Sequence, residues 1–228
     1  KPQRNAYHRF TVDRHLLEAA ANAADLVTRT DRPDLLVVGA LLHEVDMATA
    51  ISDIELTGHR TSWRETATGR EWTIGMAGRF QARNGQTAVT AARLLAAQGW
   101  QISEEAMARG LAVARIPGRA ETMPGEPRTM LDGAHNAQKV AALAADLPDL
   151  LPRPDGAQRI VVLGALEAKH VDEILMSLRP HADLLIATSP QVFAKESRSA
   201  DSLAQAARDA GYGDRAIAIP DPIQALAH

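Results

Sequence analysis

The sequence RIVVLG at residues 159–164 decides the fold class, because it is a short and nearly continuous apolar run. A similar run follows at Leu184–Thr188, and shorter ones are found at Thr129–Asp132 and Ala216–Ile219. Apolar runs of this length are typical of strands that are buried on both faces. We therefore expect four strands in the C-terminal part of the chain.

Helical patterns lie between these strands, at Ala137–Asp146, Val171–Leu178 and Ser202–Ala210. Strands that alternate with helices usually form a parallel sheet, because each helix carries the chain back to the starting edge. The sequence thus predicts an α/β fold with a Rossmann-like, mostly parallel sheet and helices on both of its faces.

Polar residues follow several of the predicted strands. Asp132 and His135 fall at the carboxyl end of the first strand, and Gly164 and the pair Thr188–Ser189 occupy equivalent positions on two others. Ligands of open α/β sheets bind at the carboxyl ends of the strands. This edge of the sheet is therefore the expected ligand site.

The middle of the chain has a different pattern. Ile51–Leu56 and Glu71–Met76 alternate roughly at period two, which predicts a hairpin or small sheet. A helix is expected near Gln86–Gln98 and another over about Glu104–Ala114, with Ser103 as its N-cap. This part is predicted to be a small α+β region.

The first fifty residues are predicted to be a helical segment. Asp13 is a suitable N-cap for a first helix, and residues 31–34 interrupt the helical pattern. A second, strongly apolar helix is expected over Leu35–Asp46. The expected domains are residues 1–50, 51–120 and 121–228.

The composition excludes several classes of protein. The 228 residues include no cysteine, which rules out disulfides and thiolate catalysis. The net charge of −3 and the lack of a basic stripe argue against nucleic acid as a partner. The longest apolar run, Leu35–Leu42, is too short to span a membrane, and the polar N-terminus lacks the core of a signal peptide. We expect a cytoplasmic protein.

Five motifs follow one another in a fixed order. They are Gly78–Gln81 with Asn84, Pro117–Glu121, Leu131–Asn136, Val162–Gly164 with Lys169, and Thr188–Ser189. With these motifs, residues 51–228 resemble the C-terminal part of the folylpolyglutamate synthases and dihydrofolate synthases of the Mur ligase superfamily. The resemblance implies an ATP-dependent ligase that joins glutamate to a folate, with Mg²⁺ bound by residues outside this chain.

The resemblance also implies the site residues. Asn84, Arg119 and Asp132 match family positions that contact ATP, and His135 lies in the same pocket. Asn84 can pair with an adenine edge, and the guanidinium of Arg119 suits phosphate oxygens. Asp132 can accept hydrogen bonds from ribose hydroxyls or orient Arg119. Catalysis would then rest on positioning and charge neutralisation.

Simpler interpretations of these residues exist. Asp132 and Gly133 could form only a tight turn, Asn84 could cap a helix, and Arg119 could be a surface residue. His135 and Asn136 could cap the helix that follows. Gly85 stands where the family usually has alanine, which predicts a weakened helix start there, and Ala137 and His170 are further departures from the family pattern.

The sequence contains no phosphate-binding loop of the Gly-x-x-Gly-Lys-Ser/Thr kind. The chain alone is therefore expected to be an incomplete and inactive ligase. The expected partners are ATP, glutamate and folate, together with either a chain that supplies the loop or a second copy bound through the Leu35–Leu42 helix face.

Residues 7–46 resemble another family, the HD phosphohydrolase domain of the bacterial nitrogen-sensing uridylyltransferase. His15 and His43 match its first two metal-binding positions, and Glu44 stands where aspartate is expected. The longer Glu44 side chain argues against metal binding, because metal distances tolerate only about ±0.2 Å. We expect no metal site here.

Three hypotheses follow from these patterns. The chain is the C-terminal portion of a folate–glutamate ligase, a fragment of a metal-dependent phosphohydrolase, or a non-catalytic chimeric or engineered chain.

Overall fold

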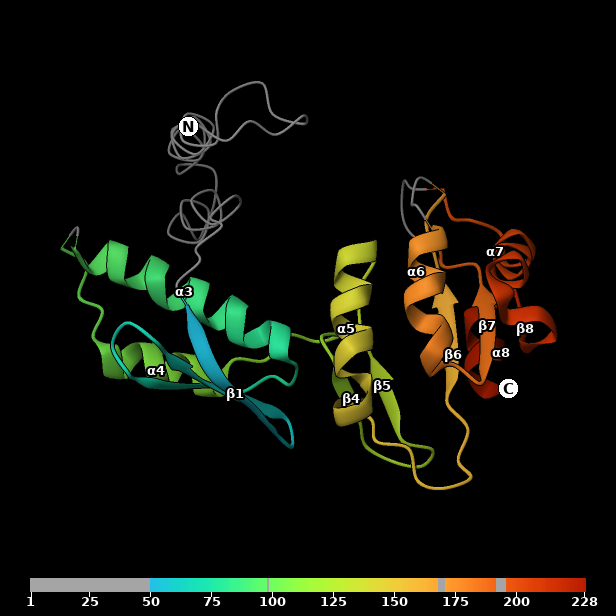
Figure 1. Ribbon diagram of the computed structural model, residues 1–228. Helices are drawn as coiled ribbons and strands as arrows, with labels where there is room; N and C mark the ends of the chain where they lie inside the picture. The colour runs from blue at the N-terminus through green and yellow to red at the C-terminus, as the bar shows by residue number, and fades with distance from the viewer. Residues whose placement is uncertain (1–49, 98, 168–170, 192–195) are drawn as a thin grey trace. The chain divides into compact units, whose positions relative to one another are not determined.

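The computed structural model describes residues 50–97, 99–167, 171–191 and 196–228 (Figure 1). The predicted helical segment at residues 1–49 lies outside the described residues, as do Lys169 and the metal candidates His15, His43 and Glu44. Among the described residues, no helix has the length and apolar character that crossing a membrane requires.

The described chain forms two compact units. The N-terminal unit holds residues 50–55, 62–75 and 81–114, and the C-terminal unit holds residues 56–61, 76–80 and 115–228, apart from the gaps given above.

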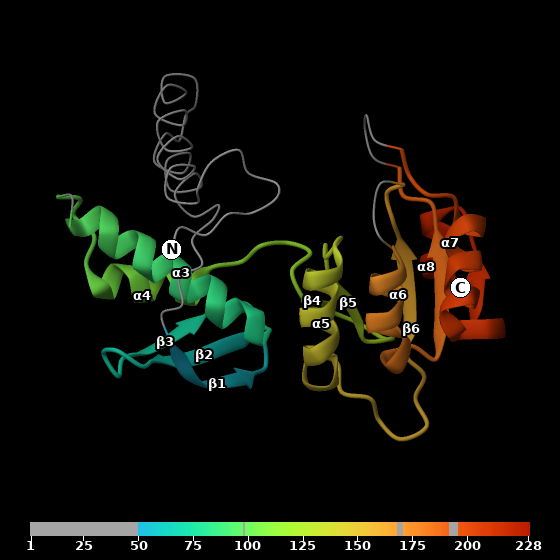
Figure 2. The ribbon, with the colours of Figure 1, turned by 45° about the horizontal axis from the view of Figure 1, so that its top comes forward.

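A three-stranded sheet and two helices confirm the predicted α+β part (Figure 2). The strands pair in the order β1-β2-β3, and the elements are β1 (Ile51–Thr57), β2 (Arg60–Glu65), β3 (Glu71–Ile74), α3 (Arg79–Ala97) and α4 (Glu104–Val113). The Ser103 hydroxyl accepts a hydrogen bond from the Ala106 amide at 3.2 Å, which confirms the predicted cap of α4. Strand β2 was not predicted, and α3 begins at Arg79 rather than near Gln86.

Gly85 lies inside α3, so the expectation that it weakens a helix start is wrong. A Cβ atom at this position would lie 2.3 Å from Cη2 of Trp63, which is closer than real Cβ contacts. Glycine is thus present because the Trp63 indole, 1% exposed on β2, packs directly against the helix backbone.

A charged network crosses the interior of the N-terminal unit. Glu65 is 2% exposed and accepts hydrogen bonds from Arg93 Nη1 at 2.5 Å and Nη2 at 3.0 Å. Gln86 and Thr68 donate to the same carboxylate at 2.9 and 2.6 Å. Arg93 also pairs with Glu104 at 2.6 Å. The buried Glu65 carboxylate is therefore paired and fully hydrogen-bonded, which a buried charge requires, while Arg93 and Glu104 are partly exposed.

The C-terminal unit contains a parallel sheet in the order β6-β7-β8. Its strands and helices are β6 (Ile160–Gly164), β7 (Leu184–Thr188), β8 (Ala216–Ala218), α5 (Ala137–Leu150), α6 (Val171–Leu178), α7 (Ala200–Ala207) and α8 (Pro222–Ala227). A short π-helical turn, Arg208–Tyr212, follows α7, and 3-10 turns occupy Arg179–His181 and Gly213–Arg215. The predicted α/β fold is confirmed.

The first predicted strand does not pair in this sheet. Residues Thr129–Leu131 form β5, which pairs antiparallel with β4 (Glu121–Met123), so that Glu121 lies opposite Leu131. The apolar run was therefore correctly assigned as a strand but given the wrong neighbour. Met130 of β5 still packs in the same cluster as Val140 of α5 and Ile174 of α6.

Both faces of the parallel sheet are covered. Leu185 and Ala187 of β7 pack in one cluster with Leu175 of α6 and Leu203 of α7. Ile186 points to the opposite face, since side chains alternate along a strand, and it is 1% exposed. Helix α8 contacts β7, and α5 and α6 lie side by side (Figure 1).

Candidate functional site

Two loops of the C-terminal unit are joined by main-chain hydrogen bonds. The Gly133 amide donates to the carbonyl of Gly118 at 2.7 Å. The Asp132 carboxylate accepts from the Ala120 amide at 2.8 Å through Oδ2 and from the Ala134 amide at 2.6 Å through Oδ1. The predicted site residues Arg119, Asp132 and His135 thus lie on one pair of linked loops, at the ends of β4 and β5.

The loop that carries Arg119 has a constrained backbone. Gly118 and Ala120, on either side of Arg119, both have positive φ angles, of 67° and 46°. The Glu121 carboxylate accepts a hydrogen bond from the Gly118 amide at 2.7 Å. Glu121 belongs to the Pro117–Glu121 motif but was not predicted as a site residue. The feature of the sequence that could have identified it is its position three residues after Gly118.

Arg119 itself is half-buried. Within the part of the chain that the structure describes, its side chain makes no hydrogen bond or ion pair. A guanidinium group carries five N–H donors and a permanent charge, so an anion is its natural partner.

His135 and Asn136 have different roles in the loop that precedes α5. His135 is exposed, and its Nδ1 lies 2.9 Å from the Gly133 carbonyl. That contact places the proton of a neutral ring on Nδ1 and leaves Nε2 available. Asn136 caps α5 by accepting from the Lys139 amide at 2.9 Å, as the simpler interpretation predicted.

Asn84 belongs to the N-terminal unit and is exposed. It lies within α3 and does not cap it, and its amide nitrogen donates to Gln81 Oε1 at 2.9 Å. Its predicted contact with adenine remains a prediction.

The carboxyl ends of β6 and β7 are closely packed. A Cβ at Gly164 would lie 2.9 Å from Pro190 Cδ, so the glycine admits the proline ring. Thr188 donates to the Pro220 carbonyl at 3.1 Å, and Ser189 accepts from the Ala200 amide at 2.8 Å. These hydroxyls therefore hold loops together in the described structure.

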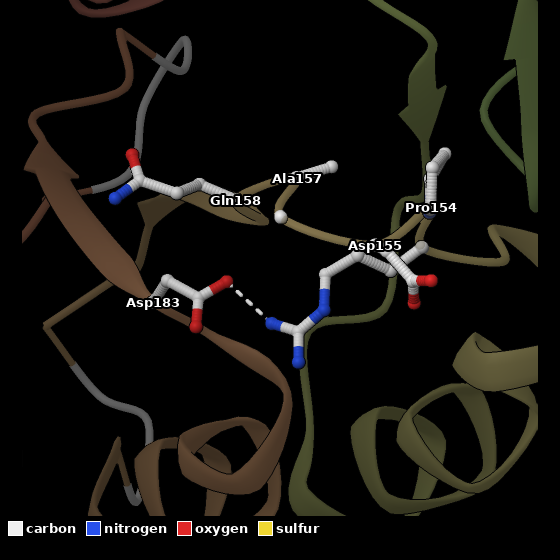
Figure 3. Close-up of a pocket in the computed structure, with 7 residues that line it drawn as sticks. Pro154, Asp155, Ala157, Gln158 and Asp183 are labelled. Carbon is white, nitrogen blue, oxygen red and sulfur yellow. Dashed lines mark hydrogen bonds and ion pairs between the residues drawn. The ribbon is translucent and has the colours of Figure 1, made fainter.

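A depression of about 420 Å³ lies at the opposite edge of the parallel sheet (Figure 3). It is lined by residues 153–158 and by Asp183, whose carboxylate lies 2.5 Å from Nη1 of Arg153. The hydrogen bond from the Arg159 amide, followed by that from Arg153, lowers the pKa of Asp183. Because this edge holds the amino ends of β6 and β7, the depression is not where such sheets bind ligands.

No three histidine or acidic side chains gather as a metal site among the described residues.

Known proteins resemble different parts of the chain. Residues 118–228 match the family described as Mur ligase, glutamate ligase domain. A probable bifunctional folylpolyglutamate synthase/dihydropteroate synthase of Halobacterium salinarum is 33% identical over 207 residues, which cover 86% of this chain and 24% of that protein.

Two further matches are a solved structure and a short sequence match. The folylpolyglutamate synthase of Mycobacterium tuberculosis, complexed with ADP and AMPPCP, has a TM-score of 0.69 and 23% identity, covering all of this chain and 54% of that one. The bifunctional uridylyltransferase/uridylyl-removing enzyme of Streptomyces coelicolor is 58% identical over only 45 residues, which are 20% of this chain and 5% of that protein.

The chain thus spans about a quarter of the Halobacterium relative and about half of the Mycobacterium structure. The predicted resemblance to folylpolyglutamate synthases is confirmed, while that to the uridylyltransferase rests on a short stretch. Residues 118–228 thus match the glutamate ligase domain of the Mur ligases, and the chain is similar to part of the folylpolyglutamate synthases.

Proposed function

We propose that the chain is the C-terminal portion of an ATP-dependent folate–glutamate ligase and that Arg119 contacts the phosphates of the nucleotide. One observation carries the proposal: a guanidinium without a partner in the described structure stands on a loop whose backbone is fixed on both sides. The ADP and AMPPCP of the similar Mycobacterium structure support a nucleotide as the anion.

In this proposal, these residues bind the nucleotide and neutralise its negative charge. A ligase of this class transfers the terminal phosphoryl group of ATP to a carboxylate and releases ADP. The amine of glutamate then attacks the acyl phosphate, which forms the amide and releases inorganic phosphate and a proton. Negative charge builds up around the transferred phosphoryl group, and a fixed guanidinium stabilises it. His135 can add a hydrogen bond through Nε2. Each role is positional, so no protein nucleophile is required.

We also propose that this chain alone does not catalyse the ligase reaction. The sequence holds no phosphate-binding loop, and Mg²⁺ would be held by residues that this sequence does not contain. We expect no ADP release when this chain alone is given ATP, glutamate and a folate. Sustained turnover would contradict the proposal that the chain is only a portion of the ligase.

Replacing Arg119 by alanine should weaken ADP binding by about ten-fold or more, since a charged hydrogen bond to phosphate contributes roughly 1.5–3 kcal/mol. Calorimetric titration of ADP into the protein measures the change. Arg128→Ala is the matched control: Arg128 is an exposed arginine of the same unit whose contact in the structure is to the Pro152 carbonyl at 3.4 Å. Equal affinities for both variants would exclude Arg119 as the phosphate contact.

The phosphohydrolase alternative and the chimeric origin stay as proposals for the N-terminal residues. They are supported by the 45-residue match to a uridylyltransferase alongside a longer match to a different family. Measuring divalent metal in the purified protein tests the former. Stoichiometric metal that is lost in the His43→Ala variant would support a metal site at His15, His43 and Glu44.

A further inference from the structure

We propose that the buried Asp146 carboxylate is a latch, which caps the first turn of α3 and so makes the stability of the N-terminal unit depend on α5. Arg79 and Asp146 both belong to the C-terminal unit, whereas α3 continues into the N-terminal unit from Gln81. The latch is independent of the proposed ligase function, because it involves no nucleotide.

Helix α3 begins at Arg79 without a cap from its own neighbours. Gly78 precedes it and has no side chain, and the first turn contains no acidic residue. The first amides of a helix need acceptors from outside the helix, and the helix dipole favours a negative charge at this end. Asp146, 67 positions later in the sequence, supplies both, because its Oδ2 accepts from the Arg79 amide at 2.6 Å.

The Asp146 carboxylate is buried and depends on a single partner residue. It is 3% exposed and is the one charged residue among the buried residues of α5. Its Oδ1 accepts from Nη1 of Arg79 at 2.9 Å, so the amide and the guanidinium of Arg79 engage both oxygens. Within the residues that the structure describes, no other donor reaches this carboxylate. A buried charge without its partner is strongly unfavourable, and the closed latch is therefore the preferred state.

The segment that leads into α3 has a separate set of contacts. The Thr61 hydroxyl is 0% exposed and lies 2.9 Å from the Met76 carbonyl and 3.1 Å from the Gly78 carbonyl. These contacts engage carbonyl oxygens and leave the Arg79 amide to Asp146. The capping of α3 therefore falls to α5 alone in the described structure.

Hydrogen exchange measured by NMR tests the cap directly. In Asp146→Ala the Arg79 amide loses its acceptor, and its exchange should become about ten-fold faster, because hydrogen bonds to ionised acceptors are strong. Asp149→Ala is the matched control. Asp149 pairs with Nη2 of the same Arg79 at 2.6 Å but is 51% exposed, so its loss should change the exchange by less than about two-fold. Native exchange rates at Arg79 in Asp146→Ala would overturn the proposal.

Tryptophan fluorescence during urea unfolding tests whether the effect reaches the N-terminal unit. All three tryptophans belong to that unit, whereas Asp146 belongs to the other. Asp146→Ala should raise the unfolding constant that they report by about ten-fold, since the cap of α3 is lost. Tyr212→Phe is the control for a general weakening of the C-terminal unit, because it removes only the hydroxyl that donates to the Leu175 carbonyl at 3.0 Å.

The tryptophan transition of Tyr212→Phe should match that of the native protein. An unchanged transition in Asp146→Ala, or an equal displacement in Tyr212→Phe, would contradict a latch at Asp146. If circular dichroism shows that Asp146→Ala does not fold, Asp146→Asn replaces it, because asparagine keeps an acceptor oxygen but loses the charge. Exchange at Arg79 should then be about three-fold faster than in the native protein. Native exchange in Asp146→Asn would also overturn the proposal.

Discussion

Replacing Gly85 by alanine is expected to destabilise the N-terminal unit by about 3 kcal/mol, even though alanine favours helices. The added methyl group would lie 2.3 Å from Cη2 of Trp63 and 3.0 Å from Cζ2. The indole cannot move aside easily, because it is buried and its Nε1 donates to Gln86 Oε1 at 2.8 Å. The clash must therefore be relieved by shifting α3 or breaking this hydrogen bond.

Gly110 is the matched control. It also lies inside a helix, α4, but a Cβ built there meets nothing within 4 Å. Gly110→Ala should stabilise the unit by about 0.5–1 kcal/mol, because alanine loses less conformational entropy than glycine. The same substitution in two helices of one unit is thus expected to have opposite signs.

Tryptophan fluorescence during urea unfolding measures both effects. The chain has three tryptophans, Trp63, Trp72 and Trp100, and all of them belong to the N-terminal unit. The signal therefore reports the unfolding of this unit without contribution from the other. A Gly85→Ala variant as stable as the native protein would show that Trp63 does not pack against α3 as described.

The C-terminal elements were predictable because their inward residues are apolar. Helix α6 and strand β7 have the predicted bounds, Val171–Leu178 and Leu184–Thr188. Helix α6 buries an apolar stripe at helical spacing, and β7 buries four of its five residues, so hydrophobic periodicity alone identifies both elements. Strand pairing was less predictable, since β5 is apolar enough for a parallel sheet but pairs with β4.

Strand β2 was missed because two of its three inward residues are polar. Thr61, Trp63 and Glu65 alternate along the strand and are all at most 2% exposed. A search for alternating apolar residues therefore detects only Trp63 in this strand. The early start of α3 was missed for a similar reason, since its buried residues include Gln81 and Gln86.

The candidate site was likewise predictable only in part. Arg119, Asp132 and His135 could be named from motifs, but the hydrogen bonds of Asp132 to Ala120 and Ala134 could not. The residue type shows that a carboxylate can accept hydrogen bonds, but only the folded loops show which donors lie within reach of it. The left-handed backbone of Ala120 was equally inaccessible, because alanine gives no signal of a positive φ.

Protonating or removing the Glu65 carboxylate is expected to lower the free energy of unfolding of the N-terminal unit by about as much as Gly85→Ala. Hydrogen bonds, chiefly from Arg93, lower the pKa of Glu65 from its ordinary value of 4.5 to about 2. This shift corresponds to roughly 3 kcal/mol of stability. Glu65→Gln should thus destabilise the unit by about 3 kcal/mol at neutral pH, because Arg93 loses a buried anionic partner.

The sign of the pH dependence follows from the direction of the shift. A carboxylate whose pKa is lowered by folding stabilises the protein above its unfolded pKa, and the contribution disappears as the pH falls. The stabilisation by Glu65 is therefore complete above about pH 5.5 and falls by about 2 kcal/mol at pH 3. Glu104, whose pKa is also lowered mainly by Arg93, adds to the loss in the same range.

Urea unfolding followed by tryptophan fluorescence at pH 3, 4, 5 and 6 tests this expectation. The native protein should lose stability steadily below pH 5, and the Glu65→Gln variant should lose about 2 kcal/mol less over the same range. Glu71→Gln is the control, because Glu71 pairs with Arg64 on the exposed side of the sheet, where an ion pair contributes at most about 1 kcal/mol. Parallel pH profiles for the native protein and Glu65→Gln would mean that folding does not lower the pKa of Glu65, because the two curves separate only if this pKa differs between the folded and unfolded states.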